Sequence, residues 1–305
     1  MKKFMTLILA GVGALAVCLS GCGTDGTDSD STDGGSNFKK DSEISVVSRE
    51  EGSGTRDAFT ELTGVLVKDD EGNKSDNTTA EAIIIDGTQG VMSNVAGDPY
   101  AIGYISMGSL NETIKAVKVG GVEATAANVK NETYKLSRPF NIVNKSGLSE
   151  VAQDFVKFIL SKEGQQVIND NGYISVVENA ESYDAASKPE GKVAVAGSSS
   201  VSPVMEKLKE AYEAINTNAK IEIQTTDSSA GITAAKEGTC DIGMASRAVK
   251  DSEIGEGADA LTSTVIAMDG IAVIVNNNNV CEDLTMDQIK NIFTGEAVTW
   301  SDVLE

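Results

Sequence analysis

Histidine is absent from the 305-residue chain, and basic residues are scarce. Without histidine, a Ser-His-Asp or Cys-His catalytic group, a histidine-ligated zinc site and a histidine pH switch are all excluded. Asp and Glu number 46 against 25 Lys and Arg, which gives a formal net charge of -21. Because nucleic-acid binding depends on basic side chains that neutralise phosphates, this balance argues against that class of function. The remaining composition, 40% hydrophobic and 23% charged, is ordinary for a globular protein.

Cysteine is also rare, and two of the four cysteines lie in an N-terminal segment with the features of a targeting signal. Two lysines precede an apolar run over residues 4–19, and the run ends in the sequence LSGC at Cys22. This order predicts a signal peptide over residues 1–22. LSGC resembles the bacterial lipoprotein signal, in which the cysteine carries the lipid and becomes the new N-terminus. An ordinary secretory peptide and a permanent membrane span are the alternatives.

A polar, Gly-rich stretch follows Cys22 and includes GTDGTDSDSTDGGSN. Residues 23–41 are predicted to be a disordered tether between a lipid anchor and a folded portion. The chain is therefore expected at the extracellular face of the cell membrane. Cys240 and Cys281 remain in the folded portion, where either a disulfide or two buried small apolar side chains would suit their surroundings.

Short β-branched runs alternate with helical patterns, which predicts an α/β fold. Helical periodicity is clearest over residues 203–215 and 150–160. Residues 178–191 show no periodicity and contain Pro189, so they are predicted to link two folded portions. Strands are predicted over residues 44–48, 83–85, 101–105, 116–119, 192–196, 221–224 and 271–276.

Three of these predicted strands run into turns rich in small hydroxyl residues, and each turn opens a predicted helix. The turns contain GSSS at residues 197–200, TTDSSAG at 225–231 and REEGSGT at 49–55. A helix N-terminus offers unpaired N–H groups and a partial positive charge, so it can hold an anion. Hydroxyl groups add hydrogen-bond donors, and the guanidinium of Arg49 could add bidentate, charge-assisted hydrogen bonds to an anion. If the three turns converge, they form an anion-binding cage.

Any single turn of this kind could equally be a helix cap, and the catalytic motifs of comparable loops are missing from the sequence. There is no GxxxxGK[ST] phosphate loop, and neither Ser53 nor Ser199 lies in a GxSxG motif. The sequence indicates neither a catalytic residue nor a metal site or cofactor.

At these residues the sequence resembles the phosphate-binding proteins of bacterial phosphate ABC importers. The resemblance covers nearly everything after residue 41 except residues 178–191. SREEGSGTRDAF and FTGEAVTWSDV are its most specific stretches, and the others are AGSSSVSPVMEKL, TCDIGMASRAVKD, AMDGIAVIVN, AIGYISMGSL and KLSRPFNIV. It implies a two-lobed type II periplasmic-binding-protein fold, with a hinge and the ligand in the cleft between the lobes.

The order of these motifs differs from that of the family, in which the GSSSVSP segment comes first. The chain is therefore interpreted as a circular permutant, in which residues 178–191 join the ancestral termini. On this interpretation one lobe is continuous over residues 139–267. The other is split between residues 42–138 and 268–305.

Phosphate ligands are carried over by the resemblance wherever the motifs match. Ser199 and Ser200 match the donors of the first turn, and Ser228 matches the serine of the second. In the third turn Arg49, Ser53, Gly54 and Thr55 match the arginine and its neighbouring donors. Glu51 stands where the family has an acid that supports the arginine, and Arg56 and Ser246 are further supporting candidates.

The family selects phosphate with an aspartate that accepts the proton of hydrogen phosphate, but Arg247 occupies the corresponding position here. Asp269 is the replacement candidate for that role, with a structural aspartate as the alternative. Arg247 itself would either reach the anion or pair with an acid at the mouth of the cleft.

The resemblance thus implies a lipid-anchored receptor that captures inorganic phosphate and delivers it to a permease, without catalysis. Another oxyanion such as sulfate or molybdate is an alternative ligand. A surface interaction protein that kept the fold without capturing a ligand is an alternative function. A phosphoester hydrolase lacks an evident metal cluster or base. A dimer that exchanges lobes is also compatible with the sequence.

Overall fold

The computed structural model describes residues 38–69, 71 and 73–304. The predicted signal peptide, Cys22 and the tether as far as residue 37 lie outside these residues. Phe38 packs against Tyr100 and Trp300, with ring centroids 5.1 and 5.9 Å away. The last four residues of the predicted tether, 38–41, therefore belong to the folded part. Within the described residues, no helix combines the length and the apolar character needed to cross a membrane.

A mixed sheet runs through the described part of the chain. Its strands are β1 (Ser45–Arg49), β4 (Ile83–Ile85), β5 (Ala101–Ser106), β6 (Lys115–Ala116), β8 (Ser137–Asn144), β9 (Ile174–Ser175), β10 (Gly191–Ser198), β11 (Ala219–Thr226), β12 (Ile242–Ala245) and β13 (Thr262–Val275). The order across the sheet is β11-β10-β12-β8-β13-β5-β1-β4, and β6 and β9 pair with β13 outside this path. Smaller pairings join β2 (Leu66–Lys68) to β3 (Lys74–Asp76) and β7 (Lys118–Val119) to β14 (Asp283–Leu284).

Helices follow most of the parallel strands, as expected for α/β units. Strong start and stop signals bound them: Ser149 caps α4 through the N–H of Ala152, and α7 ends at Gly238 in the left-handed conformation that glycine favours. The helices are α1 (Gly54–Thr63), α2 (Gly87–Gly97), α3 (Ala126–Lys130), α4 (Glu150–Leu160), α5 (Lys162–Asp170), α6 (Ser202–Ile215), α7 (Ser228–Glu237), α8 (Asp251–Ile254) and α9 (Met286–Thr294). Short 3-10 turns, η1 (Met107–Ser109), η2 (Gly257–Asp259) and η3 (Trp300–Asp302), complete the described elements.

Buried apolar side chains gather in two main cores. The first core draws on residues 46–136 and 271–303, together with Ile174. The second core draws on residues 140–267, and a smaller cluster around Val143 and Ile232 covers the other face of the same strands. Alternation along the strands explains this division, since Ile142 and Val195 face the second core while their neighbours Val143 and Ala196 face the smaller cluster.

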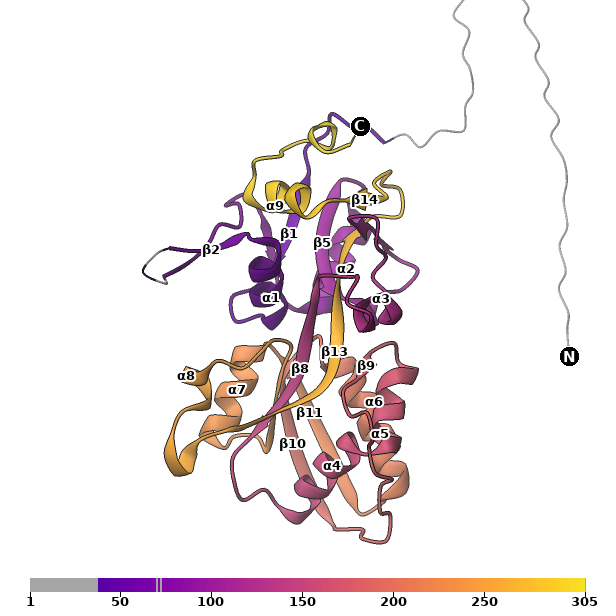
Figure 1. Cartoon of the computed structure of the whole chain (residues 1–305), viewed down its shortest axis with the longest axis vertical. Coiled ribbons are helices and arrows are strands. Elements are labelled where there is room, and N and C mark those ends of the chain that lie inside the picture. The colour runs from indigo at the N-terminus through magenta and orange to yellow at the C-terminus, as the bar shows by residue number, and fades with distance from the viewer. Residues whose placement is uncertain (1–37, 70, 72, 305) are drawn as a thin grey trace, which may run out of the picture. The chain divides into compact units, whose positions relative to one another are not determined.

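Two long strands, β8 and β13, run from one core to the other (Figure 1). They pair antiparallel from Thr262↔Asn144 to Gly270↔Ser137, with an irregularity between Val265 and Ala267. Beyond this pairing, β13 continues into the first core, where it pairs with β5 over residues 271–275. The second core therefore connects to the first through the middle of these two strands.

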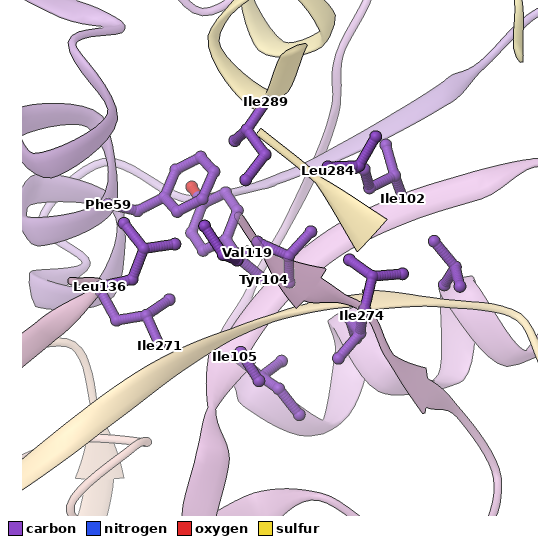
Figure 2. Close-up of a cluster of buried hydrophobic side chains, with 14 of the residues drawn as sticks. Phe59, Ile102, Tyr104, Ile105, Val119, Leu136, Ile271, Ile274, Leu284 and Ile289 are labelled. Atoms are coloured by element: carbon purple, nitrogen blue, oxygen red, sulfur yellow. The ribbon is translucent and has the colours of Figure 1, made fainter. Parts of the chain in front are cut away.

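The first core is built from both ends of the described chain. Figure 2 shows Phe59 of α1 and Tyr104 of β5 together with Ile289 of α9. The rings of Phe59 and Tyr104 stack with centroids 3.9 Å apart, and Phe293 of α9 packs edge-on against Phe59 at 4.7 Å. The ends themselves are also joined, because the N–H of Ser301 donates to the carbonyl of Lys40 over 2.7 Å.

Most of the predicted elements are present, with shifted ends. The helix predicted over residues 150–160 is α4, and the strand predicted over 83–85 is β4. The strand predicted over 271–276 is longer than expected and begins at Thr262, whereas β8 and β12 were not predicted. Cys240 and Cys281 are buried free thiols. They are therefore not joined by a disulfide, and both serve as small apolar side chains, which was the other alternative.

Residues 178–190 contain no helix or strand, and Gly191, the last residue of the predicted linker, begins β10. They are nevertheless held against the second core by Tyr183. Its ring packs edge-on against Phe158 with centroids 5.3 Å apart, and its hydroxyl donates to Asp154 over 2.5 Å. The linker is thus anchored near its middle by a half-buried tyrosine.

Candidate functional site

Four strand-to-helix turns meet where the two cores approach each other. Three of them were predicted: β1 leads into α1, β10 into α6 and β11 into α7. The fourth leads from β4 into α2 through Asp86 and Gly87, and it contributes Thr88. Because β1 lies parallel to β4 and β10 lies parallel to β11, the carboxyl ends of each pair lie at the same edge. The helix N-termini that follow these strands therefore gather in one region.

Hydroxyl groups from three of these turns lie in mutual contact. The Oγ1 of Thr55 is 2.8 Å from the Oγ of Ser200, which joins the first core to the second. Thr88 adds its Oγ1 at 3.2 Å from Ser199 and 3.4 Å from Ser200, and its N–H donates to the Oγ of Ser199 over 3.3 Å. We refer to Thr55, Thr88, Ser199 and Ser200 as the hydroxyl cluster. Of its members, Thr55 and Ser200 are almost wholly buried.

Arg49, the last residue of β1, places a guanidinium beside the hydroxyl cluster. It is 1% exposed, and its Nη2 donates to the Oγ of Ser199 over 3.1 Å. Its Nε and Nη2 also donate to both carboxylate oxygens of Glu50, over 2.7 and 2.6 Å. Its Nη1 is buried and has no hydrogen-bond partner among the described residues. Arg49 therefore keeps a charged donor that no described residue accepts.

The carboxylate that supports Arg49 is that of Glu50, and the expectation for Glu51 was wrong in this respect. Burial alone would raise the pKa of Glu50, but the hydrogen bonds and positive charge of Arg49 outweigh it and lower the pKa below its usual value. Glu51 is exposed at the tip of the turn. Arg56 supports Arg49 from the other side, because its Nη1 donates to the Arg49 carbonyl over 2.8 Å.

Ser228 and Ser246 form a second pair of hydroxyls, which lies against the start of α1. The N–H of Ser246 donates to the Oγ of Ser228 over 3.0 Å, and both residues are 1% exposed. A Cβ added at Gly54 would overlap the Oγ of Ser228 and lie 2.9 Å from the Oγ of Ser246. Ser53 serves as the N-cap of α1 and accepts the N–H of Arg56 over 3.3 Å. The structure thus brings together all the predicted serine, threonine and glycine ligands.

Asp269 is not brought into this group. It is fully buried on β13, opposite Arg138 of β8 in the strand pairing. One carboxylate oxygen accepts from Ser106 over 2.9 Å, and the other accepts from the Nη2 of Arg138 over 3.1 Å. Burial raises the pKa of Asp269 to about 6, although Arg138 opposes the shift. Asp269 therefore connects the two crossing strands, which is the structural role that the sequence left open.

We expect Asp269 to make folding more favourable as the pH falls from 7.5 to 5. The folded protein holds a proton on Asp269 below about pH 6, whereas an unfolded chain releases it above about pH 4. Since the folded state binds more protons between these values, acidification stabilises it through this group. The loss of stability in Asp269→Asn should therefore be about 1 kcal/mol larger at pH 5 than at pH 7.5. Calorimetric unfolding of both proteins at both pH values measures this, and a pH-independent difference contradicts it.

Arg247 also lies outside the hydroxyl cluster. Both of its terminal nitrogens donate to Glu253 over 2.7 Å, and its Nε lies 3.0 Å from the Oδ2 of Asp57. Of the two roles that the sequence left open, the structure places Arg247 with acids rather than with the hydroxyl groups.

Thr88 is the residue that sequence reasoning missed, although the strand over 83–85 was predicted and is followed by Asp-Gly-Thr.

The two cores joined by crossing strands, with polar donors drawn from both, define a binding protein of the periplasmic-binding-protein fold. The sequence model of the PBP superfamily domain matches residues 29–163 and 183–305. Phosphate-binding protein PstS 2 of Streptococcus agalactiae serotype V (strain 2603 V/R) is 47% identical over 306 residues, which cover 99% of each chain. PstS 2 of Streptococcus pneumoniae serotype 4 (strain TIGR4) is 45% identical over 302 residues, again 99% of each chain.

A solved structure is similar along most of the chain. The crystal structure of a phosphate-binding protein of a phosphate ABC transporter from Streptococcus pneumoniae TIGR4 is 48% identical, with a TM-score of 0.67. The match between the two structures covers 86% of this chain and 100% of the crystallised chain. This chain belongs to the PBP superfamily and, within it, to the PstS family of phosphate-binding proteins. The resemblance drawn from the sequence motifs is thereby confirmed.

Proposed function

We propose that this protein captures inorganic phosphate between two lobes and delivers it to a phosphate ABC permease. One observation carries the proposal: the buried guanidinium of Arg49 stands beside hydroxyl groups from both cores, and its Nη1 has no hydrogen-bond partner in the described part of the chain. Guanidinium and hydroxyl groups at helix N-termini are the donors that a tetrahedral oxyanion requires. The proposal involves no covalent step.

The acidic composition is compatible with this ligand. A dehydrated anion is held by fixed dipoles and short hydrogen bonds, so it does not need a basic protein surface. A binding constant of about 1 μM or tighter corresponds to at least about 8 kcal/mol. Several charge-assisted hydrogen bonds can supply this after the losses of desolvation. We assign Arg49, Ser53, Gly54, Thr55, Thr88, Ser199, Ser200 and Ser228 to the phosphate site.

The lobes in this proposal are residues 42–138 with 268–305, and residues 139–267. The distribution of the two cores supports these boundaries, with Ile174 as the one exception. The lobes would open and close about the middle of β8 and β13, since these strands connect them. Closure would bring Thr55 and Ser200 together around the anion.

The chain order is proposed to be a circular permutation of the family order, with residues 178–191 joining the ancestral ends. The irregular path of this segment and the contact between the ends of the described chain support this interpretation. A chain that begins at residue 191, links residue 305 to residue 38 by a short flexible loop and ends at residue 178 should fold and bind phosphate. A failure of that chain to fold would contradict the interpretation.

Attachment to the outer face of the cell membrane through a lipid on Cys22 completes the proposal. It rests on the sequence LSGC and on the polar stretch that follows. Cys22→Ala should prevent lipid attachment, measured by incorporation of labelled fatty acid. Labelling that persists in this variant would exclude Cys22 as the anchor.

Calorimetric titration of the purified protein with phosphate at pH 7 tests the function directly. We expect one phosphate per chain, with an affinity that excess sulfate or molybdate leaves unchanged. Strong competition would identify another oxyanion as the ligand. If a demonstrably folded protein released no heat, the capture of phosphate would be refuted and a surface interaction role would be favoured.

A further inference from the structure

A second set of polar contacts joins the two cores through residues that do not belong to the hydroxyl cluster. Arg247 follows β12 in the second core and is 4% exposed. Its Nε lies 3.0 Å from the Oδ2 of Asp57, which belongs to α1 in the first core. Lys250 reaches the same oxygen, with its Nζ at 3.3 Å. Asp57 thus receives two cations from the opposite core.

The orientation of Arg247 is fixed within its own core. Glu253 of α8 binds Nη1 and Nη2, each over 2.7 Å, in a bidentate pair. Burial alone would raise the pKa of Glu253, but Arg247 lowers it below its usual value, so the pair is charged at neutral pH. The third nitrogen of the guanidinium, Nε, makes no hydrogen bond within the described residues and lies 3.0 Å from the Oδ2 of Asp57, so it attracts this carboxylate as an ion pair. The cation is therefore positioned before the cores come together.

Ser229 extends these contacts toward the turn that follows β1. Its Oγ accepts from the Nη2 of Arg247 over 3.1 Å. Its N–H and its hydroxyl both donate to the carbonyl of Gly52 in the first core, each over 3.2 Å. Arg247, Lys250 and Ser229 on one side, with Asp57 and Gly52 on the other, form a continuous set that we call the latch.

We propose that the latch stabilises the closed arrangement of the lobes directly and thereby slows the release of phosphate. This inference rests on the proposed closure around phosphate, and it assigns Arg247 and Asp57 as positioning residues rather than ligands. Within the described residues, the contacts of the latch use no side chain of the hydroxyl cluster, so closure can form them without a bound anion. Arg247 thus stands at the family's aspartate position but acts on the opposite lobe instead of the anion.

The variant Asp57→Asn removes the charge that both cations share and keeps the shape of the side chain. We expect the dissociation rate of phosphate, measured by stopped-flow displacement, to rise about tenfold. Asp57→Glu should restore most of the slow release because it keeps the carboxylate. Glu282→Gln is the matched control, since Glu282 pairs with Lys115 over 2.7 Å within the first core. If Asp57→Asn releases phosphate at the rate of the control, the latch is refuted.

A measurement without phosphate separates this inference from the proposed function. Nitroxide labels at the exposed positions Lys207 on α6 and Asp287 on α9 report the distance between the lobes in the full chain by electron paramagnetic resonance. Without phosphate, the closed population should be smaller in Asp57→Asn than in the wild type or Glu282→Gln. Equal populations in the three proteins would overturn the inference even if phosphate binds. A wild type that binds no phosphate would refute the proposed function and leave the distances to decide the latch.

Discussion

Replacing Arg49 with methionine is expected to weaken phosphate binding at least about a hundredfold. Arg49 is the guanidinium that contacts the hydroxyl cluster, and its buried Nη1 is a donor that no described side chain uses. Hydrogen bonds from a charged donor contribute about 1.5–3 kcal/mol each, so the loss of two of them accounts for the expected change. Calorimetric titration with phosphate measures the affinity. Arg49→Lys should lie between the two proteins, because lysine keeps the charge without the planar fork.

The control for this experiment must separate a binding defect from a folding defect. In Arg49→Met the carboxylate of Glu50 loses both of its charged donors and remains partly buried. The double variant Glu50→Gln with Arg49→Met removes this unpaired charge. Lys207→Met is a matched loss of one surface charge, since Lys207 pairs with Glu210 at 2.8 Å. Wild-type affinity in the folded double variant would contradict the role of Arg49.

Replacing Gly54 with alanine is expected to reduce phosphate affinity by at least about a hundredfold without lowering the stability of α1. Gly54 is the first residue of the helix and is not among the glycines with positive φ, so its backbone suits alanine. The added Cβ would overlap the Oγ of Ser228, and it would still lie 3.0 Å from the Cβ of Ser228 if that hydroxyl rotated. The lobes could therefore not approach as closely as the binding site requires. Thermal unfolding and phosphate titration of the same sample distinguish the two properties.

A second substitution makes this prediction sharper. Adding Ser228→Gly to Gly54→Ala removes the nearer of the two side chains that the new Cβ meets and leaves only the Oγ of Ser246 at 2.9 Å, so closure and part of the affinity should return. Gly97→Ala is a suitable control because no atom lies within 4 Å of its added Cβ. If Gly54→Ala alone binds phosphate as tightly as the wild type, the close approach of α1 to Ser228 is not needed for binding.

The sequence was sufficient to predict the three turns that carry most of the site, because each is encoded locally. Each has a β-branched strand, a run of small hydroxyl residues and a helical pattern within about 20 residues. Thr88 has the same local pattern with fewer hydroxyl groups. Its role depends on β4 lying beside β1, a pairing between segments more than thirty residues apart.

The errors concern side-chain directions that only tertiary contacts decide. Glu50 and Glu51 are neighbours of the same chemistry, and their roles differ because the chain reverses at Gly52, which has φ of 86°. Asp269 has the burial expected of a functional carboxylate, but its partner is set by the register of β13 against β8. The role of Arg247 depends on a residue 190 positions earlier in the chain.

The division of the first core between two distant segments has a consequence for the order of folding. All residues of the second core lie between positions 140 and 267, so this core can assemble from one continuous segment. The first core needs β13 and α9, and its last member is Val303. Without α9, Phe59 and Tyr104 lack the cover of Phe293. We therefore expect the second core to form first and the first core to be completed only when residues 271–303 join it.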